Sequence, residues 1–182
     1  MDLDENNYSN IIFITGGTKS GKSEFAEYLG RKVKNITYIA LSEPRAEDIN
    51  WQKKILHHRK RRPKDWKLVE TNNLISALKS EKGPLLIDSI GGFIMESINK
   101  NEDEWIKKIY LLLDLLKMRT TTTLIVGEQV GWSLVSEYAI GNRYIERLGE
   151  LQKKITSISE ENWLTINGRA IKLDNISFEI PS

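Results

Sequence analysis

A glycine-rich stretch near the start of the chain has the composition of a phosphate-binding loop. Residues 16–23 read Gly-Gly-Thr-Lys-Ser-Gly-Lys-Ser, which matches the pattern G-x-x-x-x-G-K-[ST]. Its glycines let backbone N–H groups approach phosphate oxygens, and the helix expected to follow adds the positive end of its dipole. The Lys22 ammonium can reach β- and γ-phosphates, and the Ser23 hydroxyl can bind Mg²⁺. The stretch therefore predicts a site for a nucleoside triphosphate.

An acidic residue further along the chain could hold the same metal ion. Asp88 directly follows the apolar run 85–87. A carboxylate at the end of a strand can bind Mg²⁺ directly or through water. The alternative is that Asp88 only caps the helix that follows. Because the chain also carries a phosphate loop, we favour the metal role.

A basic segment gathers eight Lys and Arg residues between Lys53 and Lys67, together with both histidines, His57 and His58. Such a run is often only a solvated face, and Trp51 and Trp66 beside it would also fit RNA binding. A third interpretation is that the segment handles polyphosphate. Guanidinium groups bind phosphate oxygens, and a neutral imidazole could attack an α-phosphorus to form a phosphoramidate. Neighbouring cations would keep the imidazole neutral and balance the charge of departing pyrophosphate.

The elements that must position these residues alternate between strands and helices. Strands are expected at 10–15, 36–41, 66–70, 85–88, 121–126, 163–166 and 169–172, and helices at 20–33, 49–60, 74–80, 90–98, 102–118 and 142–158. The alternation predicts a doubly wound α/β fold with a mostly parallel sheet of the P-loop NTPase type and a C-terminal hairpin turning at Asn167-Gly168. Ligands of such sheets bind beyond the carboxyl ends of the strands. We therefore expect the phosphate loop, Asp88 and the segments after Leu41 and Val126 at one edge.

Composition limits the class of protein. The chain has 182 residues, which predicts a single P-loop domain over 10–174 between a flexible tail at 1–9 and a tail at 175–182. It has no cysteine, which excludes disulfides and thiolate chemistry, and its net charge of +2 argues against bulk attraction to nucleic acid. No apolar run could span a bilayer. The polar start resembles neither a signal nor a transit peptide, so we expect a cytoplasmic protein.

The order of these motifs resembles the bifunctional adenosylcobinamide kinase / adenosylcobinamide-phosphate guanylyltransferase family. After the phosphate loop come Tyr-Ile-Ala at 38–40, Ile-x-x-His-Arg-x-x-Arg-Pro-x-x-Trp at 55–66 and Leu-Leu-Ile-Asp-Ser-Ile at 85–90. The histidine lies 35 positions after the loop, and this segment makes the match specific. The resemblance covers about residues 10–172, nearly all of the chain.

This resemblance implies two reactions of cobalamin biosynthesis. Adenosylcobinamide is phosphorylated with ATP or GTP, and GMP then passes from GTP through a guanylylated histidine to give adenosylcobinamide-GDP. His58 stands at the family's His-Arg position and would be the nucleophile, with His57 as the alternative. Lys22 would assist catalysis, and Ser23 and Asp88 would hold Mg²⁺. The implied partners are a small-molecule corrinoid and a nucleoside triphosphate, with no nucleic acid and no membrane, in a homotrimer.

The residues expected to bind the nucleotide lie in the phosphate loop, after the second strand, in the basic segment and on two later strands. They are Gly16, Gly17, Thr18, Lys19, Ser20, Gly21, Lys22, Ser23, Ala40, Leu41, Ser42, Arg59, Lys60, Arg61, Arg62, Glu70 and Asp88. The sequence does not identify the residue that acts as the base of the kinase step. Glu128 is one candidate for this role.

Four positions depart from the family's pattern. A usual Asn-Glu-Val-Gly appears as Glu-Gln-Val-Gly at 128–131, and a threonine pair is replaced by glycines at 91–92. An Asn-Gln pair appears as Gln-Lys at 152–153, and an arginine expected near Ala139 is missing. These positions belong to the corrinoid and acceptor side. We therefore expect any change of activity to affect the kinase step or the acceptor rather than GTP binding.

Three other functions remain open at this point. A different P-loop small-molecule kinase would transfer a γ-phosphate without forming a covalent protein–GMP. A nucleotide-binding protein that has lost one or both activities would bind GTP without full turnover. An RNA-binding ATPase would show an affinity that falls steeply with salt, although the small net charge argues against it.

Overall fold

The computed structural model describes residues 10–41, 63–132 and 136–180. The helix expected at 49–60, the tail at 1–9 and the last two residues lie outside this part. Within it, the order of strands and helices follows the expected alternation.

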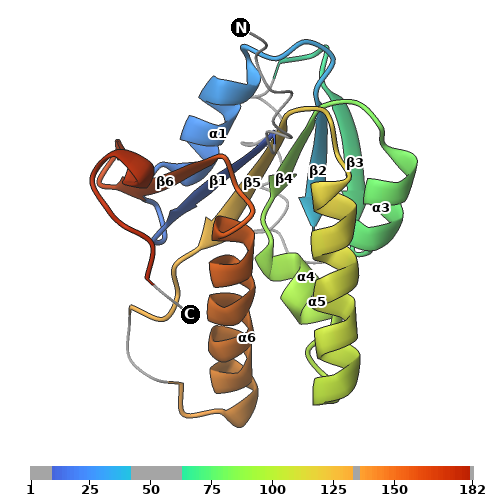
Figure 1. Ribbon diagram of the computed structural model, residues 1–182, viewed down its shortest axis with the longest axis vertical. Coiled ribbons are helices and arrows are strands. Elements are labelled where there is room, and N and C mark those ends of the chain that lie inside the picture. Colours follow the sequence, from blue (N-terminus) through green and yellow to red (C-terminus); the bar gives the residue numbers. More distant parts are fainter. Residues whose placement is uncertain (1–9, 42–62, 133–135, 181–182) are drawn as a thin grey trace, which may run out of the picture.

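One sheet organises the described part of the chain, with its seven strands in the order β3-β2-β4-β5-β1-β6-β7 (Figure 1). Neighbouring strands are parallel except for β6 and β7. The mostly parallel sheet and the C-terminal hairpin are therefore confirmed. The strands are β1 (Ile11–Gly16), β2 (Thr37–Leu41), β3 (Lys67–Thr71), β4 (Leu85–Asp88), β5 (Thr123–Glu128), β6 (Glu161–Ile166) and β7 (Arg169–Lys172).

Helices cover both faces of this sheet. On one face α1 packs against a buried cluster that includes Ile14, Tyr38 and Leu86, and on the other face α3 to α6 enclose a larger cluster. Alternate residues of β1 belong to different clusters, as the two-residue period of a strand requires. The fold is thus doubly wound. The helices are α1 (Lys22–Gly30), α3 (Leu74–Ser80), α4 (Gly91–Glu96), α5 (Glu102–Lys117), α6 (Ala139–Thr156) and a 3-10 turn (Leu173–Asn175).

Helix α5 begins where local chemistry stabilises it. The Asn101 side chain accepts from the Glu104 N–H, and the Glu104 side chain accepts from the Asn101 N–H, which forms a capping box. Buried residues of α5 recur at spacings of three and four, from Trp105 to Leu116. None of the helices in the described residues is both long enough and apolar enough to cross a membrane.

The fifth strand ends later than expected. Strand β5 continues to Glu128, because residues 127 and 128 still pair with Thr15 and Gly16 of β1. Gly127 permits this pairing, since a Cβ there would lie 2.8 Å from the Phe13 ring. The extension places Glu128 at the end of a strand rather than in a loop.

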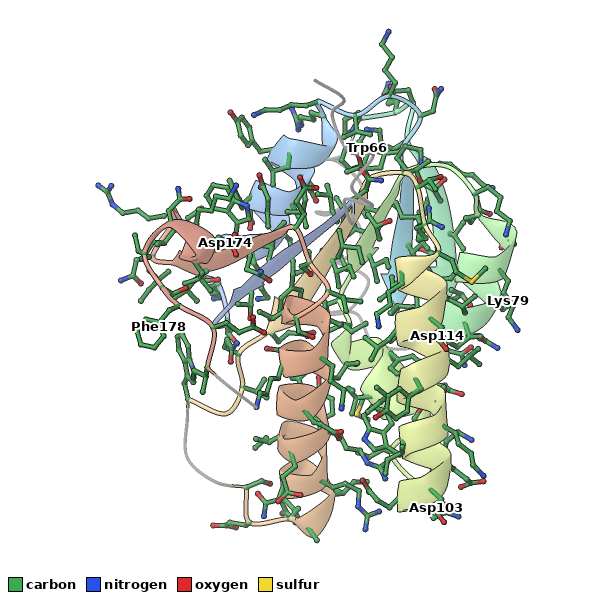
Figure 2. All side chains as sticks on the ribbon, viewed as in Figure 1. Trp66, Lys79, Asp103, Asp114, Asp174 and Phe178 are labelled. Carbon is green, nitrogen blue, oxygen red and sulfur yellow. The ribbon has the colours of Figure 1, made fainter. Side chains whose placement is uncertain are left out.

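Trp66, labelled in Figure 2, is half-buried and packs against the smaller core cluster. Its ring stacks on Tyr38 with centroids 6.4 Å apart, and a Cβ at Gly30 would lie 2.8 Å from it. A ring held in this way is not free to stack on a nucleic-acid base. The RNA-binding interpretation therefore loses one of its two aromatic residues.

Candidate functional site

The phosphate loop connects the end of β1 to the start of α1. Gly21 immediately precedes the helix with a φ of 99°, in the left-handed region that glycine adopts at little cost. Gly16 admits no side chain either, because a Cβ there would lie 2.6 Å from Ser20 Oγ and overlap Thr165 Oγ1. Both glycines of the motif are therefore required by the backbone and its packing.

Lys22, the first residue of α1, turns its side chain back over this loop. Its ammonium donates to the Gly17 carbonyl at 3.1 Å. The positive charge thus lies against the backbone that would surround a bound triphosphate. Ser23 follows on the first turn of the helix and is half-buried.

The C-terminal hairpin supports the phosphate loop from beside β1. Thr165 Oγ1 donates to the Thr15 carbonyl at 3.2 Å, so the Ser20 hydroxyl, 2.7 Å away, donates to Thr165. The Gly168 N–H in the hairpin turn donates to the Ser20 carbonyl at 3.0 Å. The sequence indicated this turn but gave no sign that it holds Ser20.

Asp88 lies at the carboxyl end of β4, beside the end of β2. Its Oδ2 accepts a 2.6 Å hydrogen bond from the Tyr38 hydroxyl. Its Oδ1 has no hydrogen bond from the described residues, so one oxygen is available to a ligand. Ala40 pairs in register with Asp88, and both lie at the expected edge.

Two members of the expected nucleotide set are placed differently. The Leu41 side chain is 6% exposed and belongs to the larger core, so only its backbone could face a ligand. Glu70 lies on β3, four strands from β1, which corresponds to about 19 Å across a sheet. The sheet therefore does not bring Glu70 beside the phosphate loop.

Glu128 ends β5, between the strand that carries Asp88 and the strand that carries the loop. The Ser89 hydroxyl donates to its Oε1, and the Gly91 N–H donates to its Oε2 at 3.3 Å. Burial raises the pKa of Glu128, and the nearby negative charge of Asp88 adds to the rise. The Ser89 hydrogen bond and the Lys22 ammonium lower this pKa in part. The carboxylate is thus electrostatically coupled to both Lys22 and Asp88.

Tyr144 of α6 completes this side of the site. A Cβ on Gly91 would overlap the Tyr144 hydroxyl and would lie 2.9 Å from Glu128 Oε1. Burial, and then the charge of Glu128, raise the pKa of Tyr144, so the phenol stays neutral near pH 7. The glycine at position 91 is what lets both side chains approach α4.

Gln129 points to the opposite face and joins a network of amides. Its Nε2 donates to Thr15 Oγ1 at 2.8 Å and to Gln152 Oε1 at 2.9 Å. Gln152 Nε2 donates in turn to the Glu128 carbonyl at 2.7 Å. Three departures from the family's pattern, at 91, 128–129 and 152, therefore meet in one region around the end of β5.

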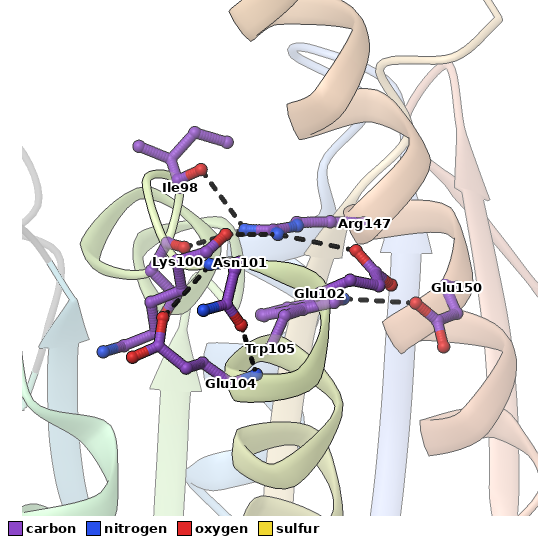
Figure 3. A network of polar contacts seen from close by, with 9 residues as sticks. Ile98, Lys100, Asn101, Glu102, Glu104, Trp105, Arg147 and Glu150 are labelled. Carbon is purple, nitrogen blue, oxygen red and sulfur yellow. Dashed lines mark hydrogen bonds and ion pairs between the residues drawn. The ribbon is translucent and has the colours of Figure 1, made fainter.

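Arg147 joins α6 to the turn after α4 (Figure 3). Its guanidinium lies 4.9 Å from the centre of the Trp105 ring and 3.7 Å from the Glu102 carboxylate. The residue is 6% exposed, and it supplies donors to carbonyls that α4 leaves without helical partners. It thereby fixes the two helices that contact Glu128. The carbonyls belong to Ser97, Ile98 and Lys100.

Seven expected site residues lie outside the described part of the chain, namely the two candidate nucleophiles and five expected nucleotide-binding residues. They are His57, His58, Ser42, Arg59, Lys60, Arg61 and Arg62. Among residues 10–41, 63–132 and 136–180, no three His, Cys, Asp or Glu side chains form a ready metal cluster. Mg²⁺ needs no such cluster, since it commonly takes one or two protein oxygens and completes its shell with phosphates and water. The open oxygen of Asp88 and the hydroxyl of Ser23 fit that requirement.

Comparisons with known proteins agree on one family. The family model described as cobinamide kinase / cobinamide phosphate guanyltransferase matches residues 12–173. The bifunctional adenosylcobalamin biosynthesis protein CobU of Escherichia coli is 25% identical over 181 residues, covering 90% of this chain and 99% of the relative. The corresponding CobP of Pseudomonas aeruginosa is 27% identical over 166 residues, covering 88% and 95%.

A solved structure supports the fold. The chain is similar to a prototypical ATPase from the type III secretion system of pathogenic bacteria, with a TM-score of 0.50 and 11% identity. The match covers 86% of this chain but only 51% of the ATPase. At this identity the likeness shows the fold alone, and it confirms the P-loop NTPase type.

Proposed function

The chain belongs to the cobinamide kinase / cobinamide phosphate guanyltransferase family, and on this basis we propose that it performs both reactions of that name. It would phosphorylate adenosylcobinamide with ATP or GTP and then transfer GMP from GTP to adenosylcobinamide phosphate. The observation that carries the proposal is the phosphate loop itself. Its glycines are constrained by the backbone and its packing, Lys22 lies against the Gly17 carbonyl, and Glu128 and Asp88 end the next two strands of the sheet.

The described residues support the nucleotide-binding part of the proposal. Loop amides and the Lys22 ammonium hold the triphosphate, and the hairpin contacts of Ser20 keep the loop in shape. Ser23 and Asp88 would hold Mg²⁺, which when bound neutralises charge on the phosphates. Lys22 remains close to the phosphorus that reacts in the kinase step.

The guanylyl transfer would use His58. Its imidazole attacks the α-phosphorus of GTP, the bond to the β-phosphate oxygen breaks, and pyrophosphate leaves with the electron pair. The phosphate of the corrinoid then attacks the same phosphorus and releases the histidine. The arginines at 59 and 62 would bind the leaving phosphates.

Product formation tests the proposal. Purified protein with adenosylcobinamide, ATP and Mg²⁺ should give adenosylcobinamide phosphate, and addition of GTP should convert it to adenosylcobinamide-GDP, each identified by mass. A protein that forms neither product would refute the proposal. Formation of only one product would show that the other activity has been lost. The homotrimer and the cytoplasmic location stay predictions from the sequence.

A further inference from the structure

Glu128 occupies the part of the site where the terminal phosphate would lie. It ends β5, which pairs with β4 on one side and with β1 on the other. It pairs in register with Gly16, the first residue of the phosphate loop, whose Lys22 reaches the β- and γ-phosphates in P-loop proteins. A carboxylate beside the start of this loop is placed to meet a group that attacks the γ-phosphorus.

The carboxylate is oriented and still able to accept a proton. Ser89 donates to one oxygen and Gly91 to the other, which fixes the plane of the group. Each carboxylate oxygen offers two lone-pair sites, so each keeps one. A base held by neighbouring donors, with acceptor capacity left, has the arrangement that general base catalysis requires.

Gln129, the residue after Glu128, points to the opposite face and has no acidic or basic side chain. Successive residues of a strand point to opposite faces, and Gln129 accordingly points toward Thr15 and Gln152. Its amide is neutral, and it donates to two neutral polar groups, the Thr15 hydroxyl and the Gln152 side-chain carbonyl. Asp88 pairs in register with Val126, two residues before Glu128, so the two acidic residues belong to the same face of the sheet.

We propose that Glu128 is the general base of the kinase step, an inference that rests on the proposed function. The hydroxyl oxygen of the acceptor attacks the γ-phosphorus, and the bond from that phosphorus to the β-phosphate oxygen breaks. The nucleoside diphosphate leaves with the electron pair, and the hydroxyl proton passes to a free lone pair of Glu128. The proton returns to solvent after the products leave.

The experiment separates the two activities in one protein. Glu128→Gln keeps the size of the side chain but removes its basicity. We expect phosphorylation of adenosylcobinamide from γ-labelled ATP to fall about 100-fold or more, since a positioned base contributes that much. GMP transfer from GTP to prepared adenosylcobinamide phosphate does not use this base and should stay within about threefold.

Two further variants control for folding and charge. Glu128→Asp keeps a carboxylate and should recover part of the kinase rate that Glu128→Gln loses. Glu146→Gln removes a similar charge from an exposed position of α6 and should leave both rates unchanged. Thermal unfolding of each variant shows that it is folded.

The outcomes distinguish this inference from the proposed function. A wild-type protein without kinase activity would refute the kinase half of the proposed function, and this inference with it. An active wild type with an equally active Glu128→Gln variant would refute the inference alone. Equal loss of kinase and GMP transfer would also refute it, because that pattern indicates a role in the shared nucleotide site.

Discussion

Gly91 and Glu128 lie 37 positions apart in the sequence and touch in the structure. The Gly91 N–H donates to Glu128 Oε2 at 3.3 Å, and a Cβ on Gly91 would lie 2.9 Å from Oε1. Both positions depart from the usual sequence pattern of the cobinamide kinase / cobinamide phosphate guanyltransferase family. Their contact makes the two departures parts of one local arrangement.

Gly91→Ala should impair the kinase step. The added methyl would displace Glu128 and the Tyr144 hydroxyl, and overpacking of this kind costs about 1–3 kcal/mol of stability. We expect kinase activity to fall more than GMP transfer, as measured with γ- and α-labelled nucleotides.

Gly149→Ala is the matched control. A Cβ there meets nothing within 4 Å, so the helix should gain about 0.5–1 kcal/mol with both activities intact. Equal kinase rates in the two variants would contradict the proposed arrangement.

Thr165→Val should weaken nucleotide binding. The valine has a similar shape but cannot bind the Ser20 hydroxyl or donate to the Thr15 carbonyl. Loss of about 1 kcal/mol of support would raise the Kd of a fluorescent GTP analogue about fivefold. Thr165→Ser retains the hydroxyl and should restore affinity. If both variants bind as the wild type does, the hairpin does not set the shape of the loop.

Much of this fold was predictable because its signals are local. The phosphate loop, the hairpin turn at Asn167-Gly168 and the apolar stripe of α5 each occupy a short stretch, and all three are confirmed. The end of β5 was not predictable. Its last residues pair with β1 only because Gly127 lets the Phe13 ring pack against the backbone, a contact across 114 positions.

The candidate site also contains residues that local motifs predict and residues that they do not. Lys22 and Asp88 were predicted from motifs, and the sheet brings both to the expected edge. The roles of Thr165, Tyr144 and Gln152 depend on partners far away in the sequence, for which a single sequence carries no signal. The role of Glu70 stays a prediction, since it pairs in register with Ala40 but its strand lies four strands from β1.

Gln129→Glu should destabilise the protein at neutral pH. The Thr15 hydroxyl can turn to donate to an ionised carboxylate, but Gln152 Oε1 cannot, so that hydrogen bond is replaced by repulsion between two oxygens. We expect a loss of about 1–3 kcal/mol in urea unfolding. The protonated form can donate one bond, so the folded pKa of the new group is raised. The deficit relative to wild type should shrink as pH falls through that pKa. A deficit independent of pH would contradict this explanation.

Arg147→Met should loosen the contact between α4 and α6. It removes hydrogen bonds to three carbonyls, of which Ser97 alone keeps a donor within the described residues, the Lys100 N–H, and we expect the loss to cost about 2–3 kcal/mol. Arg143→Met, at an exposed position of the same helix, should change stability by less than about 0.5 kcal/mol. Similar unfolding midpoints for the two variants would show that Arg147 does not hold these helices together.

Detection of the covalent protein–GMP intermediate tests the proposed guanylyl transfer through His58. Wild-type protein incubated with α-labelled GTP and Mg²⁺ should acquire an acid-labile label, and a chase with adenosylcobinamide phosphate should move that label into adenosylcobinamide-GDP. The label should be absent from His58→Ala and present in His57→Ala. Absence of label from the wild type, or a label that the corrinoid phosphate does not remove, would contradict the account.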